Sequence, residues 1–169
     1  MTQETIYKIG LSLLPRVGDV TAKKIVAYLG GIEAVFAEKK KNLEKIPGIG
    51  SGLAKAISNQ KILQKAENEL KEVIKRNIKV VFYLDPDYPE RLKHCEDGPV
   101  LLYQKGEIDL NYPKILSFVG TRNATSYGRE ACEKIIADLK NRGHDVVIMS
   151  GLAYGIDICA HKAALLSCR

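Results

Sequence analysis

Apolar residues follow two different spacings along this chain. In the segments 14–25 and 46–57 they recur at helical spacing, and the stretch 52–76 keeps this spacing without a breaker, which predicts one or two helices there. Beyond it, β-branched and aromatic runs predict strands at 78–84, 99–106 and 114–120, with a short helix between Tyr88 and Cys95. The sequence therefore predicts a helical first part and a second part built on strands.

From residue 114 onward, strands, glycine-containing loops and helices alternate. The segments in order are KILSFVG, TRNATSYG, REACEKIIADLKNRG, HDVVIMSG and LAYGIDICAHKAALL. This alternation favours a parallel sheet with right-handed crossovers, in which ligands bind at the carboxyl ends of the strands. The loops 120–128 and 150–155 are both expected at that edge.

The helical part contains an internal repeat at an offset of 32 residues, LPRVGDVTAKKI (14–25) against IPGIGSGLAKAI (46–57). The matched pairs are Pro15 and Pro47, Val17 and Ile49, Gly18 and Gly50, Ala22 and Ala54, Lys23 and Lys55, and Ile25 and Ile57. Each copy predicts a glycine-containing turn followed by a helix. The second copy in particular resembles the helix-hairpin-helix family.

Such a hairpin can grip a DNA backbone. Glycines such as Gly48 and Gly50 let the backbone approach a phosphate, which the N–H groups of the next helix then face. Lys55, one turn into that helix, adds a charge. The first copy carries Arg16 where the second has Gly48, which weakens the case for backbone approach there. We predict a DNA-binding module over residues 1–66; the alternatives are a packing scaffold and a module that binds only proteins.

Charge is unevenly divided along the chain. The formal net charge is +6, and residues 1–66 hold 11 Lys and Arg against 5 Asp and Glu, whereas residues 67–169 hold 15 of each. The excess favours an anionic partner for the helical module, although a solvated lysine face has the same composition. With 46% hydrophobic residues, the chain can bury a core.

Targeting, metal and cofactor signals are missing from the sequence. No apolar run is long enough for a membrane span, and the first residues lack the features of a signal peptide, so we expect a cytoplasmic protein without membrane contact. Cys95, Cys132, Cys159 and Cys168 form no C-x-x-C pair and are expected to be reduced thiols, with no metal. Neither a G-x-G-x-x-G fingerprint nor a P-loop occurs, so no nicotinamide or ATP cofactor is expected.

Several motifs of the second part resemble the DNA-processing protein A (DprA, or Smf) family. They are VGTRNATSYGREACEKI and MSGLAYGIDICAHKAAL, preceded by YLDPDYPERL and GPVLLYQKG, and they cover roughly residues 70–169. The resemblance implies an α/β protein in which a helix-hairpin-helix module precedes a Rossmann-like parallel-sheet domain over residues 67–169. It also implies a protein of natural transformation that binds single-stranded DNA, protects incoming DNA, helps load the RecA recombinase and catalyses no reaction.

The resemblance also implies a pocket for the DNA backbone at the strand ends. Its residues here are Gly120, Arg122, Ser126, Tyr127, Gly128, Ser150 and Gly151. Gly155, Asp157 and His161 are expected to shape the loop, and Tyr154 stands where many members have arginine, so that a stacking ring replaces a phosphate contact. The family's later strands, winged helix, homodimer interface and RecA contact would lie largely beyond Arg169, so this chain corresponds to the first part of such a protein.

Ser150, Asp157 and His161 are also the residue types of a hydrolase triad. The G-x-S-x-G elbow is missing, and one carboxylate with one histidine is too small a set for a metal. Asp157 at the start of a helix complements the helix dipole, and we predict that His161 holds its carboxylate in place. The alternative function is a nucleoside monophosphate phosphoribohydrolase, whose P-G-G-x-G-T loop does not occur before Arg169.

Overall fold

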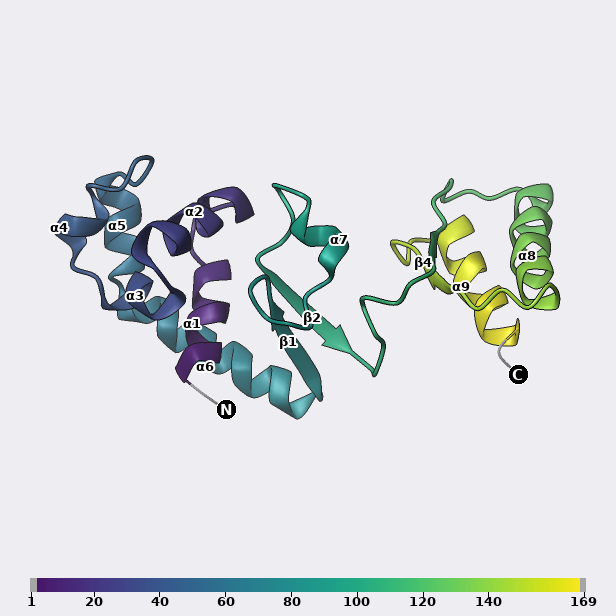
Figure 1. Cartoon of the computed structure of the whole chain (residues 1–169), viewed down its shortest axis with the longest axis horizontal. Coiled ribbons are helices and arrows are strands. Elements are labelled where there is room, and N and C mark those ends of the chain that lie inside the picture. Colours follow the sequence, from purple (N-terminus) through teal and green to yellow (C-terminus); the bar gives the residue numbers. More distant parts are fainter. Residues whose placement is uncertain (1–2, 168–169) are drawn as a thin grey trace. The chain divides into compact units, whose positions relative to one another are not determined.

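The computed structural model describes residues 3–167 and divides the chain into two compact units, Met1–Asn111 and Tyr112–Arg169 (Figure 1). Cys168, one of the predicted reduced thiols, lies outside the described residues, whereas Cys95, Cys132 and Cys159 carry free thiols. No helix within residues 3–167 is both long and apolar enough to cross a membrane.

Within the described residues of the first unit, six helices come before the strands, in the part that the sequence predicts to be helical. They are α1 (Gln3–Ser12), α2 (Asp19–Leu29), α3 (Ile32–Ala37), α4 (Lys40–Leu43), α5 (Ser51–Ile57) and α6 (Gln60–Lys75). The stretch 52–76 makes two helices rather than one, because Asn59 caps α6 by accepting a hydrogen bond from the Lys61 N–H.

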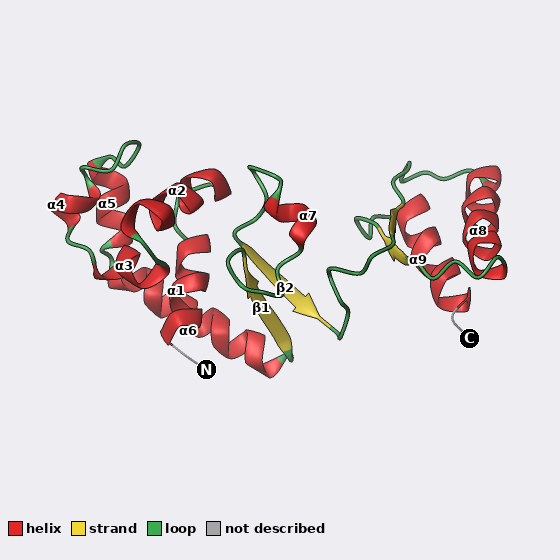
Figure 2. Cartoon of the chain, viewed as in Figure 1, coloured by secondary structure: helices red, strands yellow, loops and turns green. Residues whose placement is uncertain are grey.

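A two-stranded antiparallel sheet completes this unit (Figure 2). Strand β1 (Ile78–Phe82) pairs with β2 (Leu101–Lys105), and the short helix α7 (Glu90–Lys93) lies between them in sequence. Helix α6 leads directly into β1 and buries Ala66, Leu70 and Val73 in a cluster that includes Ile9 of α1. The predicted boundary between residues 66 and 67 falls inside α6 and stays a prediction, while the division into two compact units falls after Asn111.

Both hairpin copies contribute to one hydrophobic core in the first unit. Its buried members are Leu11, Leu14, Ala22, Ile25, Val26, Ile32, Val35, Leu43, Ile46, Ile49, Ala54, Ile57, Ile62, Phe82 and Val100. Three of the aligned positions are therefore buried in both copies: Leu14 with Ile46, Ala22 with Ala54 and Ile25 with Ile57. Phe82 and Val100 place the β1–β2 region in the same core.

The second unit is a strand–helix–strand–helix unit. Strands β3 (Ile115–Ser117) and β4 (Val147–Met149) are parallel, α8 (Ser126–Asn141) connects them, and α9 (Ile156–Ser167) follows. The two helices pack on each other around Cys132, Ile136, Cys159, Ala160 and Ala163. Burial next to Cys159 raises the pKa of the Cys132 thiol to about 11. The predicted α/β class is confirmed.

Helix α8 begins earlier than the sequence predicts, at Ser126 rather than near Arg129. Thr125 is its N-cap, and the threonine hydroxyl accepts a hydrogen bond from the Gly128 N–H at 3.1 Å. Ser126, Tyr127 and Gly128 consequently form the first turn of a helix and not part of a loop.

Candidate nucleic-acid interface

The loops after β3 and β4 meet at the carboxyl edge of the parallel pair. The Ile156 N–H donates to the Thr121 carbonyl at 3.2 Å. Gly155 has a φ of +88°, and a Cβ there would lie 2.1 Å from the Thr121 oxygen and 2.6 Å from the Arg122 oxygen. Only glycine fits this position, so the sequence holds the backbone at Arg122 directly against the second loop.

Two predicted DNA-binding glycines, Gly120 and Gly128, lie against Ile156. A Cβ on Gly120 would lie 2.6 Å from the Ile156 Cβ, and one on Gly128 would lie 3.4 Å from the Ile156 Cδ1. The lack of a side chain at Gly120 makes room for the first residue of α9, whereas a Cβ at Gly128 would make only an ordinary contact. Packing thus requires Gly120 whether or not DNA approaches it.

Asp157 is a buried carboxylate at the start of α9. Its side chain is only 5% exposed, and Oδ2 accepts a hydrogen bond from the Gly151 N–H at 3.0 Å. A Cβ on Gly151 would lie 3.1 Å from the same oxygen, so a larger residue there would crowd this contact. Buried charge is costly without such partners, and the helix N-terminus stabilises it further.

His161 has a different partner from the one that the sequence predicts. Its Nε2 lies 2.7 Å from the Ser150 Oγ, and that oxygen also accepts a hydrogen bond from the Leu152 N–H at 3.2 Å. The i, i+4 spacing puts Asp157 and His161 on one face of α9, which faces the loop that follows β4. Each side chain therefore takes a partner from the loop: Asp157 takes Gly151 and His161 takes Ser150.

The same contacts bear on the predicted roles of Ser150. The sequence expects this serine to face the ligand, whereas the structure directs its hydroxyl toward His161 and the loop backbone. A serine oxygen near an imidazole nitrogen is also the first contact of a hydrolase triad, but the acid needed to orient the imidazole is bonded to the Gly151 N–H. The three side chains do not form a triad relay.

A cavity of about 380 Å³ opens at this edge, lined by Arg122, Leu152, Ala153, Tyr154 and Ile158. Arg122 is exposed, as are Tyr154 (84%) and Leu152 (67%). Ser126 and Tyr127 of the first α8 turn are also exposed. The structure thus brings a cation and exposed apolar surface into one hollow, which can bind an anionic ligand that also has flat or apolar parts.

Leu152 was not predicted by sequence reasoning as a site residue. Its φ of +55° places it in the left-handed region, which a leucine rarely adopts. In this conformation its N–H donates a hydrogen bond to the Ser150 hydroxyl.

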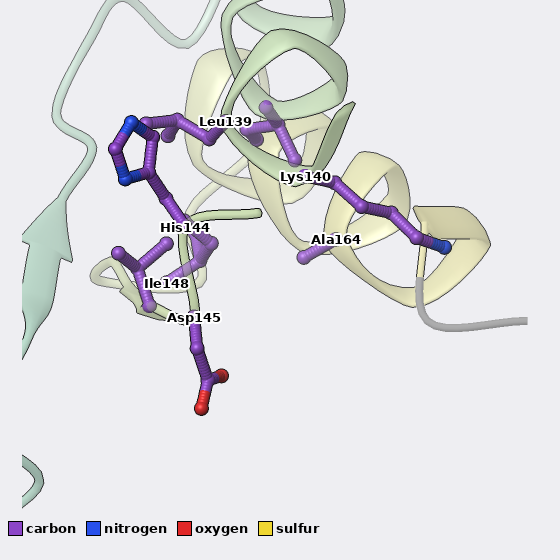
Figure 3. A pocket seen from close by; sticks show the side chains of 8 residues that line it. Leu139, Lys140, His144, Asp145, Ile148 and Ala164 are labelled. Atoms are coloured by element: carbon purple, nitrogen blue, oxygen red, sulfur yellow. The ribbon is translucent and has the colours of Figure 1, made fainter. Parts of the chain in front are cut away.

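A second cavity, of about 290 Å³, lies near the start of β4 and is a weaker candidate. Its lining residues are Ile136, Leu139, Lys140, His144, Asp145, Val146, Ile148 and Ala164. Figure 3 shows the His144 ring and the Asp145 carboxylate pointing in opposite directions. Within residues 3–167, no three His, Cys, Asp or Glu side chains gather as a metal site would require.

The two hairpin turns of the first unit have the same backbone conformation. Arg16 and Gly48 both have positive φ, +63° and +88°, and the helix N-caps Gly18 and Gly50 have φ/ψ of −84°/170° and −80°/171°. Arg16 therefore keeps the shape of the turn, at the cost of left-handed strain. The sequence repeat is also a structural repeat.

The surroundings of the two turns differ. In the first copy, the Asp19 carboxylate accepts a hydrogen bond from the Val100 N–H at 2.8 Å, and the Lys23 ammonium donates to the Cys95 and Glu96 carbonyls. In the second copy, Gly48, Gly50 and Lys55 are exposed, as is Ser51 at the position of Asp19. The predicted DNA-contacting residues thus lie on an accessible surface.

The comparisons with known proteins agree with this architecture. The family model for DNA recombination-mediator protein A matches residues 79–168, more than half of the chain. The chain therefore belongs to the DprA/Smf family of DNA recombination mediators.

Individual relatives show how much of the family's protein is represented. The chain is 47% identical over 83 residues to the DNA processing protein DprA of Streptococcus pneumoniae, covering 48% of this chain and 28% of that protein. It is 29% identical over 166 residues to the protein Smf of Synechocystis, covering 96% of this chain and 41% of that one. The chain thus spans less than half the length of these relatives.

A solved structure extends the similarity to the whole chain. The X-ray structure of DNA processing protein A from Streptococcus pneumoniae matches with a TM-score of 0.61 and 29% identity, covering 99% of this chain and 55% of that chain. The fold described above is accordingly the fold of a DprA protein over the matched region.

Proposed function

We propose that this chain binds single-stranded DNA at the edge where the loops after β3 and β4 meet. The observation that carries the proposal is the cavity shared by Arg122 and Tyr154, in a member of a DNA recombination-mediator family. A guanidinium binds phosphate oxygens through two parallel hydrogen bonds, which grips the backbone without reading the bases.

The surrounding residues support a sequence-tolerant mode of binding. Ser126 and Tyr127 are exposed on the first turn of α8, next in sequence to the loop that carries Arg122. Gly120 and Gly151 make room for side chains behind this surface, and Gly128 lies against Ile156. Ser150, Gly155, Asp157 and His161 fix the second loop. Because phosphate contacts release counterions, binding is expected to weaken steeply with salt.

The helical module is proposed as a second DNA contact. Gly48, Gly50 and Lys55 are exposed around one hairpin turn, and the first 66 residues hold the positive charge excess of the chain. Such a turn suits a phosphate of duplex or single-stranded DNA equally, because it contacts the backbone alone.

In the whole protein, we assign this binding to natural transformation, where it protects incoming DNA and assists RecA loading. Membership of the recombination-mediator family supports this assignment. A homodimer and a RecA contact belong to the same proposal, and we expect residues beyond the matched region of the relatives to contribute to both.

Charge reversal at Arg122 tests the proposed pocket. Arg122→Glu should weaken binding to a fluorescent oligothymidine by at least tenfold at low salt, because it replaces the phosphate contact with repulsion. Arg142→Glu, at the other end of α8, is the matched control and should bind like the parent. Equal affinity of the Arg122→Glu variant and the parent would show that the pocket is wrongly placed.

The enzyme alternative has its own assay. A phosphoribohydrolase would release adenine from AMP, whereas a DNA-binding protein without catalysis releases none. Adenine release that persists in a highly purified sample would overturn the assignment as a protein without enzymatic activity.

A further inference from the structure

Two large side chains at the tip of the loop after β4 are exposed to solvent. Tyr154 is 84% and Leu152 is 67% exposed, and both line the cavity that contains Arg122. Neither side chain helps the second unit to form its core, which lies around Cys132 and Cys159. Their exposure therefore needs an explanation other than folding.

The backbone of the loop tip is anchored at both ends although its side chains are exposed. At its first end, the Leu152 N–H is fixed by Ser150, which is hydrogen-bonded to His161 of α9. At its other end, Gly155 lies against the carbonyl groups of Thr121 and Arg122. Leu152 adopts a left-handed backbone conformation between these anchors. Strain of this kind persists where the surrounding structure determines it, and it is concentrated at binding sites.

We propose that Tyr154, supported by Leu152, is a stacking platform for a nucleobase of the single strand whose phosphate Arg122 binds. This inference rests on the proposed function and assigns a separate task to each side of the cavity. A phenol ring offers a flat, uncharged face to any base, so it adds affinity without sequence preference. Arg122 supplies the charge that the neighbouring phosphate requires.

Ser150 and His161 are positioning residues for this platform. Their hydrogen bond holds the serine oxygen where it accepts the Leu152 N–H, which sets the direction of the chain two residues before Tyr154. Neither side chain needs to touch DNA for this role.

The experiment compares two strands that have the same phosphates and differ only in their bases. Fluorescence anisotropy of the whole chain is measured with an oligothymidine and with an abasic strand of equal length. The parent should bind the oligothymidine about tenfold more tightly, since one stacked base contributes on this scale. Tyr154→Ala should abolish this preference while its affinity for the abasic strand stays at the parental value, and Tyr154→Phe should keep the preference.

The matched control is Tyr28→Ala, which removes an exposed tyrosine of the first unit and should behave like the parent. If Tyr154→Ala keeps the parental preference, the stacking role is wrong although the proposed function stands. If Tyr154→Ala weakens binding to both strands equally, the ring contacts the backbone and the inference also fails. If the parent binds neither strand, the proposed function fails and the inference fails with it.

The positioning role has a separate test. Ser150→Ala removes the acceptor for the Leu152 N–H and should reduce the preference for oligothymidine over the abasic strand, whereas Ser150→Thr keeps a hydroxyl and should restore it. Circular dichroism melting curves establish that both variants are folded. A parental preference in folded Ser150→Ala would contradict the role of the serine in positioning the platform.

Discussion

The two hairpin turns of the first unit share a backbone shape but differ in what their side chains contact. Their N-cap glycines, Gly18 and Gly50, have nearly equal dihedral angles, and the residues two positions earlier both lie at positive φ. Yet Asp19 of the first copy is bonded to the backbone at Val100, while Ser51 of the second copy is exposed. The repeated motif therefore has the same local geometry in both copies, while the residue at the start of the helix has different contacts in each.

The difference extends one turn further into the helices. Lys23 donates to the Cys95 and Glu96 carbonyls and lies 5.9 Å from the centre of the Tyr83 ring. Lys55, its counterpart, is exposed. The first copy joins the helices to the β1–β2 region, and the second copy leaves its polar surface accessible.

The largest effect on stability should come from substitutions at buried positions that the two copies share. Ile25 and Ile57 are 1% and 2% exposed, so Ile25→Ala and Ile57→Ala should each lower the free energy of unfolding by about 3 kcal/mol. Urea unfolding of the whole chain, followed by circular dichroism, measures both. A large loss for one variant and a small one for the other would break the structural equivalence of the copies.

Alanine substitutions at Asp19 and Ser51 should then change the stability of the protein by different amounts. Asp19→Ala leaves the buried Val100 N–H without its acceptor and should cost about 1–3 kcal/mol. Ser51→Ala, at an exposed position, should change stability by less than about 0.5 kcal/mol. Asp19→Asn keeps an acceptor oxygen and serves as the control. Equal costs for the two alanine variants would mean that the Asp19 contact contributes nothing.

A smaller effect on stability is expected from substitutions at the two residues with a left-handed backbone, Arg16 and Gly48. Gly48→Ala introduces a side chain at a φ of +88° and should destabilise by about 1 kcal/mol. Arg16→Gly relieves the same strain but gives the unfolded chain more freedom, so its net change should be about zero. The urea midpoints of the two variants give the comparison, and a loss at Arg16→Gly as large as at Gly48→Ala would indicate that the arginine side chain stabilises the turn.

The smallest expected effect concerns DNA. If the second copy contacts a phosphate, Lys55→Gln should weaken binding by a few-fold and reduce the salt dependence by about one counterion. Lys23→Gln should leave the affinity unchanged, because Lys23 is bonded within the unit. Anisotropy titrations at several salt concentrations measure both. Equal losses for the two lysine variants would remove the functional distinction between the copies.

Regular elements were predictable from the sequence because their signals are local. Apolar spacing gave the helices and strands, and the match of Gly18 with Gly50 revealed the structural repeat. The partner of His161 was not predictable in this way, since it depends on how α9 lies against the loop after β4. Gly120 is a similar case: its packing against Ile156 brings together residues far apart in the chain.

The anchoring of the loop after β4 has a consequence for the evolution of this site. Its anchoring contacts are made by Ser150, Gly155 and His161, whereas the side chain of Tyr154 is 84% exposed. Substitutions at this one position are therefore close to neutral for folding, so selection can exchange a charged for an aromatic residue there by its effect on the ligand alone. On the proposed function, a fixed loop with one interchangeable side chain would let a lineage tune how it holds nucleic acid without rebuilding the protein.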